Sequence, residues 1–97
     1  MALKFDYNQT IAQAKQIDQV ANDMQNNVSK KMNEICENMK AAWTGKAAVA
    51  YHKYITTLRE DLLKKAKYLR DTADFLRTAA KKMKAADEAA KQSAQNI

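Results

Sequence analysis

The chain has 97 residues, enough for one domain, and contains a single Gly, no Pro and a single Cys. Gly and Pro interrupt helices most strongly, and good helix formers fill most positions, so the composition predicts an all-α fold. The net charge of +6 arises entirely after Gly45, where twelve Lys and Arg oppose six acids, and the lone cysteine excludes an internal disulfide.

The N-terminal residues and the overall hydropathy argue against membrane targeting. Residues 1–7 contain no apolar core of the kind found in a cleavable Sec signal peptide. No apolar run approaches the roughly 20 residues that a membrane-spanning helix needs. We therefore expect a chain without a transmembrane segment that is synthesised as a soluble protein in the cytoplasm.

An amphipathic helix is expected over about residues 8–42. Asn8 or Thr10 can begin it by accepting a hydrogen bond from the free N–H groups of the first turn. Apolar residues then recur every three or four positions, which places them on one helix face opposite a polar face. This first stripe consists of Ile11, Ala14, Ile17, Ala21, Met24, Val28, Met32, Ile35, Met39 and Ala42.

A tight reversal is predicted at residues 43–45. Gly45 can adopt the left-handed conformation that closes a helix end. Trp43 is a large amphipathic ring that can pack across both helices at the turn. A Trp-x-Gly tripeptide alone indicates only a plug and a turn residue, but its place between two long helices is far more selective.

A second helix is expected over about residues 46–93, and its apolar stripe is stronger. From Leu62 to Met83 large apolar residues alternate with Ala, which lets neighbouring helices approach closely. The near-heptad spacing is typical of helices packed at small crossing angles. The stripe consists of Ala48, Tyr51, Ile55, Leu58, Leu62, Ala66, Leu69, Ala73, Leu76, Ala80 and Met83.

These elements predict a single domain over residues 1–97, an antiparallel two-helix hairpin. Because two helices cannot cover both stripes, we expect a second chain to pack antiparallel and complete a four-helix bundle. The pairing is predicted to be part of folding. The residues expected in the core and dimer contact are Ile17, Met24, Val28, Ile35, Ile55, Leu58, Leu62, Leu69 and Leu76.

Little in the sequence suggests catalysis. His52 is the only His and Cys36 the only Cys, and a hairpin offers neither an oxyanion cradle nor an enclosed pocket around such a pair. We interpret Cys36 as a small hydrophobic residue beside the first stripe. There is no phosphate-binding Gly-rich loop and no metal-ligand spacing, so we expect no enzyme activity, no cofactor and no metal.

With Trp43-Thr44-Gly45 between two amphipathic helices, the chain resembles the WXG100 family over essentially its full length. The resemblance implies a helical hairpin with the motif in its turn, forming homodimers or heterodimers with WXG100-like chains. It also implies export by a type VII secretion system without a Sec signal peptide. The implied role is protein binding as a virulence-associated effector, a co-secreted partner or a chaperone, with the export ATPase or an escorted toxin as partner.

The family also has a C-terminal export motif, which in actinobacterial members is a Tyr, three intervening residues and then an acid. Here Asp87 matches the acid and Met83 stands where the Tyr would be. This departure indicates a Gram-positive, Firmicutes-type machine. In an antiparallel dimer the longer second helix would bring the Asp87 region of one chain to Trp43 of the other, forming a composite export signal.

An alternative function is binding of nucleic acid or an anionic membrane through the basic second helix. Its densest patch consists of Arg77, Lys81, Lys82 and Lys84. Acids bracket this patch, and no aromatic residue follows Phe75 to stack on a base. We therefore do not expect a nucleic-acid partner.

Overall fold

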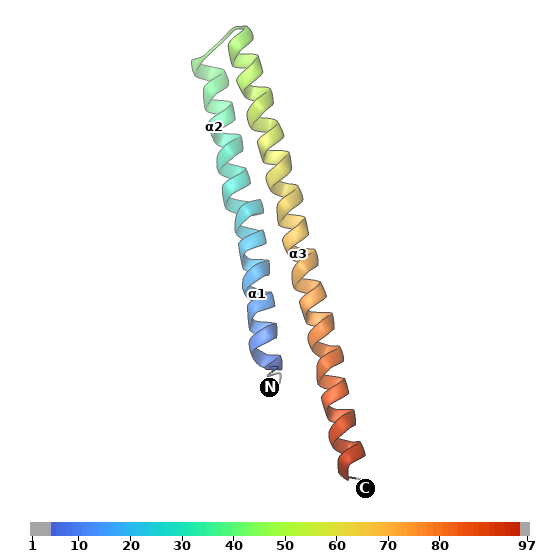
Figure 1. The fold of residues 1–97 in the computed structure, drawn as a ribbon. Coiled ribbons are helices and arrows are strands. Elements are labelled where there is room, and N and C mark those ends of the chain that lie inside the picture. The colour runs from blue at the N-terminus through green and yellow to red at the C-terminus, as the bar shows by residue number, and fades with distance from the viewer. Residues whose placement is uncertain (1–4, 96–97) are drawn as a thin grey trace.

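A computed structural model describes residues 5–95 as an antiparallel helical hairpin (Figure 1). The first arm comprises α1 (Tyr7–Asp23), a π-helical turn η1 (Met24–Val28) and α2 (Ser29–Ala42), and the second arm is α3 (Lys46–Gln95). The described residues contain no strand, so the expected all-α hairpin is confirmed. The ends of the expected domain, residues 1–4 and 96–97, lie outside the described part.

The first arm begins at an acidic cap. The Asp6 carboxylate accepts the Gln9 backbone N–H at 2.9 Å, and the Thr10 hydroxyl donates to the Asp6 carbonyl at 2.8 Å. A capping carboxylate satisfies a free N–H and favours the positive end of the helix dipole. The cap is therefore Asp6, ahead of the Asn8 and Thr10 suggested by the sequence.

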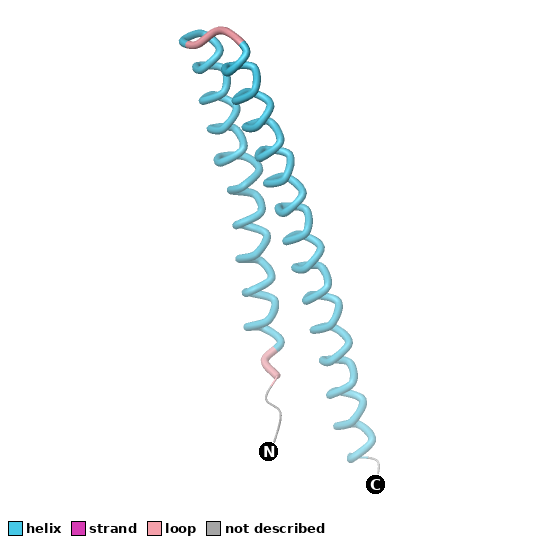
Figure 2. The backbone as a smooth tube through the Cα atoms, turned by 45° about the horizontal axis from the view of Figure 1, so that its top comes forward, coloured by secondary structure: helices cyan, strands magenta, loops and turns pink. Residues whose placement is uncertain are grey.

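The turn reverses the chain in a few residues (Figure 2). Trp43 is extended at φ −142° and ψ 128°, and its N–H donates to the Met39 carbonyl at 2.9 Å. Gly45 has φ +106°, a conformation that side chains with a Cβ rarely adopt. The Gly45 carbonyl then accepts the Val49 N–H at 3.2 Å as α3 begins.

The two arms meet along a seam of small residues. Each seam residue is at most 5% exposed, and neighbours along α3 are seven positions apart. Small side chains let two helix backbones approach closely, and the seven-residue repeat keeps them on the shared side. The seam consists of Ala14, Ala21, Ser29 and Cys36 from the first arm and Ala66, Ala73 and Ala80 from α3.

The π-helical turn corrects the phase of this seam. Ala21 and Ser29 are eight positions apart instead of seven, and within η1 the Ser29 N–H donates to the Met24 carbonyl, five residues back. Such a turn absorbs one extra residue inside a continuous helix. Ser29 and Cys36 consequently face α3, where Arg59 Nε donates to Ser29 Oγ at 2.8 Å.

Candidate functional site

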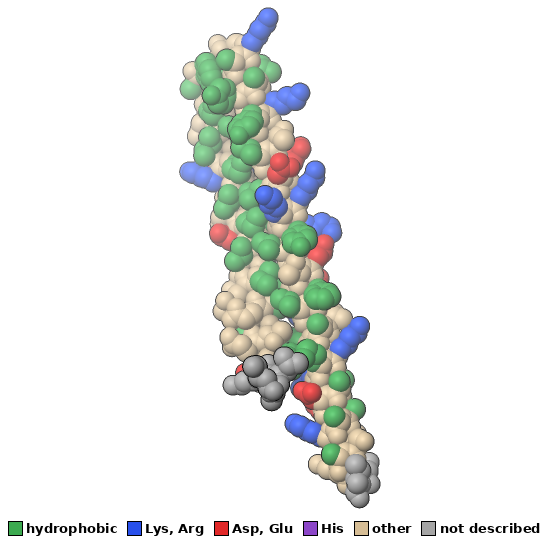
Figure 3. All heavy atoms as spheres, viewed as in Figure 1, with side chains coloured by type: hydrophobic (Ala, Val, Ile, Leu, Met, Phe, Trp, Pro, Cys, Tyr) green, Lys and Arg blue, Asp and Glu red, His purple; other side chains and the backbone are tan. Residues whose placement is uncertain are grey.

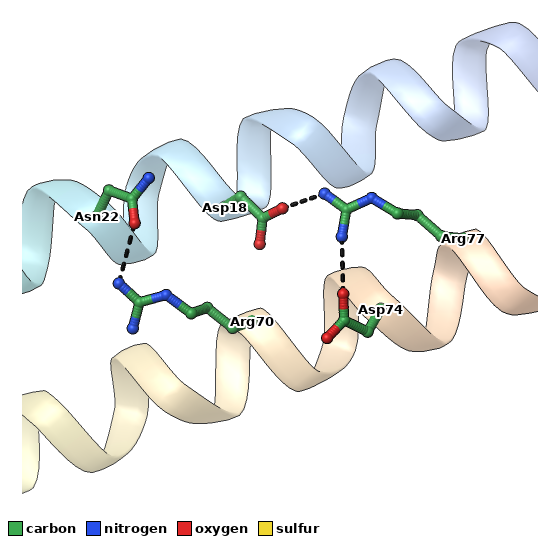
Figure 4. Close-up of polar contacts among 5 residues, drawn as sticks. All are labelled: Asp18, Asn22, Arg70, Asp74 and Arg77. Atoms are coloured by element: carbon green, nitrogen blue, oxygen red, sulfur yellow. Dashed lines mark hydrogen bonds and ion pairs between the residues drawn. The ribbon is translucent and has the colours of Figure 1, made fainter.

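One side of the seam carries polar links between the arms (Figure 4). Asp18, Arg70 and Arg77 each follow a seam alanine by four positions, which turns all three to one flank. Arg77 binds Asp18 across the hairpin and Asp74 on its own helix at 2.9 Å. The hydrogen bond that Arg77 donates to Asp18, together with the nearby negative charges, raises the pKa of Arg77 above its ordinary value, although partial burial opposes the shift. This polar flank joins the arms without a large core.

Arg70 adds a second link on the polar flank. Its Nη2 donates to the Asn22 side-chain oxygen at 2.9 Å and also contacts the Gln25 side-chain oxygen. In Figure 4, Arg70 and Arg77 reach from α3 to Asn22 and Asp18 of α1. Because each arginine has its partners within the hairpin, this flank is largely occupied by its own contacts.

The other side of the seam is apolar and open, and we call it the apolar face. Most of its residues lie three positions after a seam residue or one before it. Ile55, Leu58 and Leu62 do so when the seven-residue repeat of α3 is continued back to positions 59 and 52. Antiparallel arms turn both sets to the same side. None of them is buried, and Val28, Ile35 and Leu58 are 41%, 45% and 42% exposed. The apolar face consists of Ile17, Met24, Val28, Met32, Ile35, Met39, Ile55, Leu58, Leu62, Leu69, Leu76 and Met83.

All nine residues expected in the core and dimer contact therefore lie on one face of the hairpin. The close contact within the hairpin is made by the small seam residues instead. Hydrophobic side chains also gather along much of the length of the face drawn in Figure 3. Apolar surface that extends over both arms is typical of a protein–protein contact.

The predicted turn motif forms an aromatic corner. The Trp43 ring is 41% exposed, and its centroid lies 5.2 Å from that of Tyr51 at an interplanar angle of 49°. Below the turn lies a cavity of about 340 Å³ whose lining includes Cys36, Met39, Lys40, Trp43, Val49 and His52. Trp43 thus serves as an exposed ring and as one wall of a cavity.

Cys36 and His52 lie close together near the turn. The contact runs from Cys36 Sγ to the His52 backbone carbonyl at 4.0 Å and does not involve the imidazole. Cys36 is a buried seam residue beside the first stripe. The contact therefore places the thiol in the packed seam.

The predicted export residues lie at and beyond the level where the first arm begins. Met83 is 47% exposed and Asp87 is exposed. Lys84 Nζ lies 4.5 Å from the Tyr7 ring centroid, which marks the point where the first arm begins. Beyond it α3 runs past the first arm (Figure 1). Trp43 and Asp87 are therefore at opposite ends of one hairpin, about 60 Å apart at 1.5 Å per residue.

Among residues 5–95, no group of three or more His, Cys, Asp and Glu is placed to hold a metal ion. No helix in that part of the chain is long and apolar enough to cross a membrane.

Sequence reasoning missed the polar flank and the cavity. A usable signal for the flank was present: Arg70 and Arg77 are seven apart, each four residues after a buried alanine, and Asp18 has the same relation to Ala14. The cavity had no comparable signal, because it depends on how the turn backbone spaces the two helix ends.

The family model described as "Proteins of 100 residues with WXG" matches residues 2–88. The match includes the first arm, the Trp43–Gly45 turn and α3 as far as residue 88, and so contains the Met83–Asp87 pair. Comparison with curated proteins and with solved structures gives no significant match. Because the matched region spans most of the chain, the protein belongs to the WXG100 family.

Proposed function

We propose that this protein is a type VII secretion substrate that acts by binding proteins and not by catalysis. WXG100 proteins are small, helical and secreted, are generally not enzymes, and typically pair with other WXG100-like chains. The observation that carries the proposal is the apolar face, which remains open in a single hairpin.

The apolar face supports pairing with a second hairpin. The apolar stripe of α3 extends from Tyr51, near the turn, to Met83, near the N-terminal end of the first arm. If two copies pack antiparallel by a two-fold axis, these stripes overlap fully when Met83 of one copy lies opposite Tyr51 of the other. This alignment buries both apolar faces in a four-helix bundle.

The same alignment supports a composite export signal. The Met83 end of one α3 reaches the turn of the other copy, and the following residues project beyond it. Trp43 of one chain and Asp87 of the other would then share one surface that only the dimer possesses. An export ATPase that recognises this surface would select folded dimers over single hairpins.

Asp87→Ala tests the export signal, with Glu88→Ala as a matched control. The two acids are adjacent and exposed, but they point about 100° apart on α3. We expect Asp87→Ala, Met83→Ala and Trp43→Ala to lower the amount of protein in the medium, whereas Glu88→Ala leaves it unchanged. The measurement is the ratio of secreted to cellular protein in a strain that has the secretion system.

Stability must be separated from export in this experiment. An exposed charge such as Asp87 contributes less than about 0.5 kcal/mol to stability, so Asp87→Ala should stay folded and dimeric by circular dichroism and sedimentation. Normal secretion of Asp87→Ala and of a folded Trp43→Ala variant would show that no such signal exists in this chain.

The role of the chain after export can be tested by identifying what is bound to it in the medium. An effector, a co-secreted partner and a chaperone would differ in whether the chain leaves the cell alone, with a different WXG100-like chain or with a toxin. Purification of the secreted chain from the medium distinguishes these roles by the stoichiometry of what accompanies it.

The structure gives less support to the nucleic-acid or membrane alternative. Arg77 binds two acids, and Lys67 pairs with Asp71 at 3.0 Å, so cations of α3 are partly neutralised within the chain. A phosphate-binding surface would instead present free cations, and its affinity would fall steeply with salt.

A further inference from the structure

The cavity under the turn shares Met39 with the apolar face and Trp43 with the composite export signal, but its other lining residues have no role in either. Its volume is about 340 Å³, at the lower end of the range for sites that enclose a ligand. Met39, Trp43, Ala48 and Val49 give it a mainly apolar lining, and Cys36 lies at its inner end in the seam. A cavity of this size and character fits one large apolar side chain.

The end of the hairpin around this cavity is mainly positive. Residues 38–59 contain four basic residues and no acid. Lys40 lines the cavity, and Lys46 begins α3, whose first turn contains no acidic residue. The free N–H groups of that turn add the positive end of the helix dipole. An incoming segment with negative charge is therefore favoured.

Lys40 is available to such a segment although it already has a partner. Its Nζ lies 3.3 Å from Glu37 Oε1, but the two side chains are 53% and 58% exposed. An ion pair this exposed is weak and exchanges readily for another. The pair therefore reduces the positive charge at the cavity edge without closing the cavity.

Exposed aromatic rings surround the same end. Trp43, Tyr51 and Tyr54 are 41%, 52% and 63% exposed. Trp and Tyr are enriched at the residues that dominate protein–protein binding, especially around pockets that receive an anchor side chain. Aromatic rings, cations and an apolar cavity together describe a recognition site for a peptide segment.

We propose that the turn end of the hairpin is a docking site for an acidic segment of another protein, which inserts one large apolar side chain into the cavity beneath Trp43. The acids of the segment are held by Lys40, Lys46 and the N-terminal turn of α3. A concave apolar lining suits a single side chain better than a lipid surface, which is met by apolar groups that project outward.

The test uses the full-length chain and a display library of random twelve-residue peptides that lack Trp. Selected peptides are expected to contain an apolar anchor among several acids. Trp43 is the only Trp and lines the cavity, so its fluorescence reports binding directly. Replacing the anchor by Ala, or the acids by their amides, should weaken binding about tenfold or more.

Matched variants locate the site. Ala48→Phe fills the cavity and Lys46→Glu reverses a cation at its edge, so each should weaken binding by a similar factor. Ala47→Phe adds the same ring at an exposed neighbour that does not line the cavity, and Lys64→Glu reverses an exposed cation midway along α3, away from the turn of either copy. Both controls should bind like the parent chain.

Two results would overturn the proposal. The first is a selection that yields no peptides, or only peptides whose binding survives the Ala48→Phe substitution. The second is a Trp43 emission shift with phosphatidylserine vesicles that is equal in the parent and in Ala48→Phe, without any peptide binding. That result would assign the positive end to an anionic membrane.

Discussion

At the residue scale, small side chains fix how closely the two arms pack. Ser29 and Cys36 occupy seam positions that α3 fills with alanine, and both are nearly inaccessible to solvent. Each has a polar contact there, since Ser29 accepts from Arg59 and Cys36 lies near the His52 carbonyl. Because the other seam residues are alanines, a small side chain is the requirement that all seam positions share.

Cys36→Ser and Cys36→Leu separate size from chemistry. Serine keeps the small volume and can donate to the His52 carbonyl, so we expect helicity and pairing to remain nearly unchanged. Leucine adds bulk to a closed seam and should lower the free energy of unfolding by about 1 to 3 kcal/mol. Chemical denaturation at one chain concentration measures both. Equal stability of the two variants would contradict a size-limited seam.

Gly45 is required for its backbone conformation and not for space. A Cβ at Gly45 would meet no atom within 4 Å, but its φ of +106° is strained for any other residue. Gly45→Ala should therefore cost about 1 to 2 kcal/mol of unfolding free energy. Thr44→Ala, at an exposed neighbour, is the control and should have little effect. A thermal melt that is identical for the two variants would refute this explanation.

At the element scale, the π-helical turn reconciles two seven-residue repeats. Ala14 and Ala21 follow one phase, and Ser29 and Cys36 follow another that is shifted by one residue. In the first stripe, consecutive four-residue steps at Met24, Val28 and Met32 reflect this shift. The same pattern occurs in α3, which has no such turn, so the spacing alone does not identify it.

Removing Asn26 should convert η1 to an ordinary α-helix. The deletion restores a spacing of seven between Ala21 and the following seam serine, so the seam keeps its contacts. We expect the unfolding free energy to fall by no more than about 0.5 kcal/mol, or to rise.

Deletion of Lys67 is the matched control, because it breaks the spacing between Ala66 and Ala73. The rest of α3 would rotate by about 100° and lose the seam. Circular dichroism melts compare the two deletions. If both destabilise the chain equally, the phase correction assigned to η1 is wrong.

At the scale of the whole molecule, the hairpin is a thin rod of 79 × 21 × 17 Å with a small internal core. Its fully buried residues are mostly alanine, and the larger side chains of the apolar face stay half-buried or exposed. A chain with so little buried apolar surface gains modest stability on its own. Partner binding is therefore expected to supply much of the folding free energy.

A dimer is the expected outcome of sedimentation at micromolar concentration, with a mass about twice that of one chain. The melting temperature should rise with chain concentration, because association is linked to folding. Leu69→Asp places an unpaired charge in the apolar face, which forms the proposed dimer contact, and should dissociate or unfold the protein. Tyr68→Asp is the control on the same helix, since Tyr68 is 72% exposed and lies outside the apolar face. A cooperative monomer at nanomolar concentration would contradict this prediction.

The all-α hairpin and the composition of its apolar face follow from the order of residues along the chain. Both depend on local properties: a helix-forming composition, apolar spacing of three and four, and a Gly at the single reversal. The Trp43–Gly45 motif also identified the family, because it is read along the chain and needs no contact between distant residues.

Only the tertiary structure decided which apolar residues face inward and which stay open. Ala14 and Ile17 belong to one stripe by spacing, yet the close approach of two backbones admits the small side chain and leaves the large one beside the seam. The η1 phase shift, the Asp18–Arg77 link and the cavity under Trp43 likewise depend on the alignment of the two arms. That alignment is set by packing between residues distant in sequence, which periodicity along one helix does not contain.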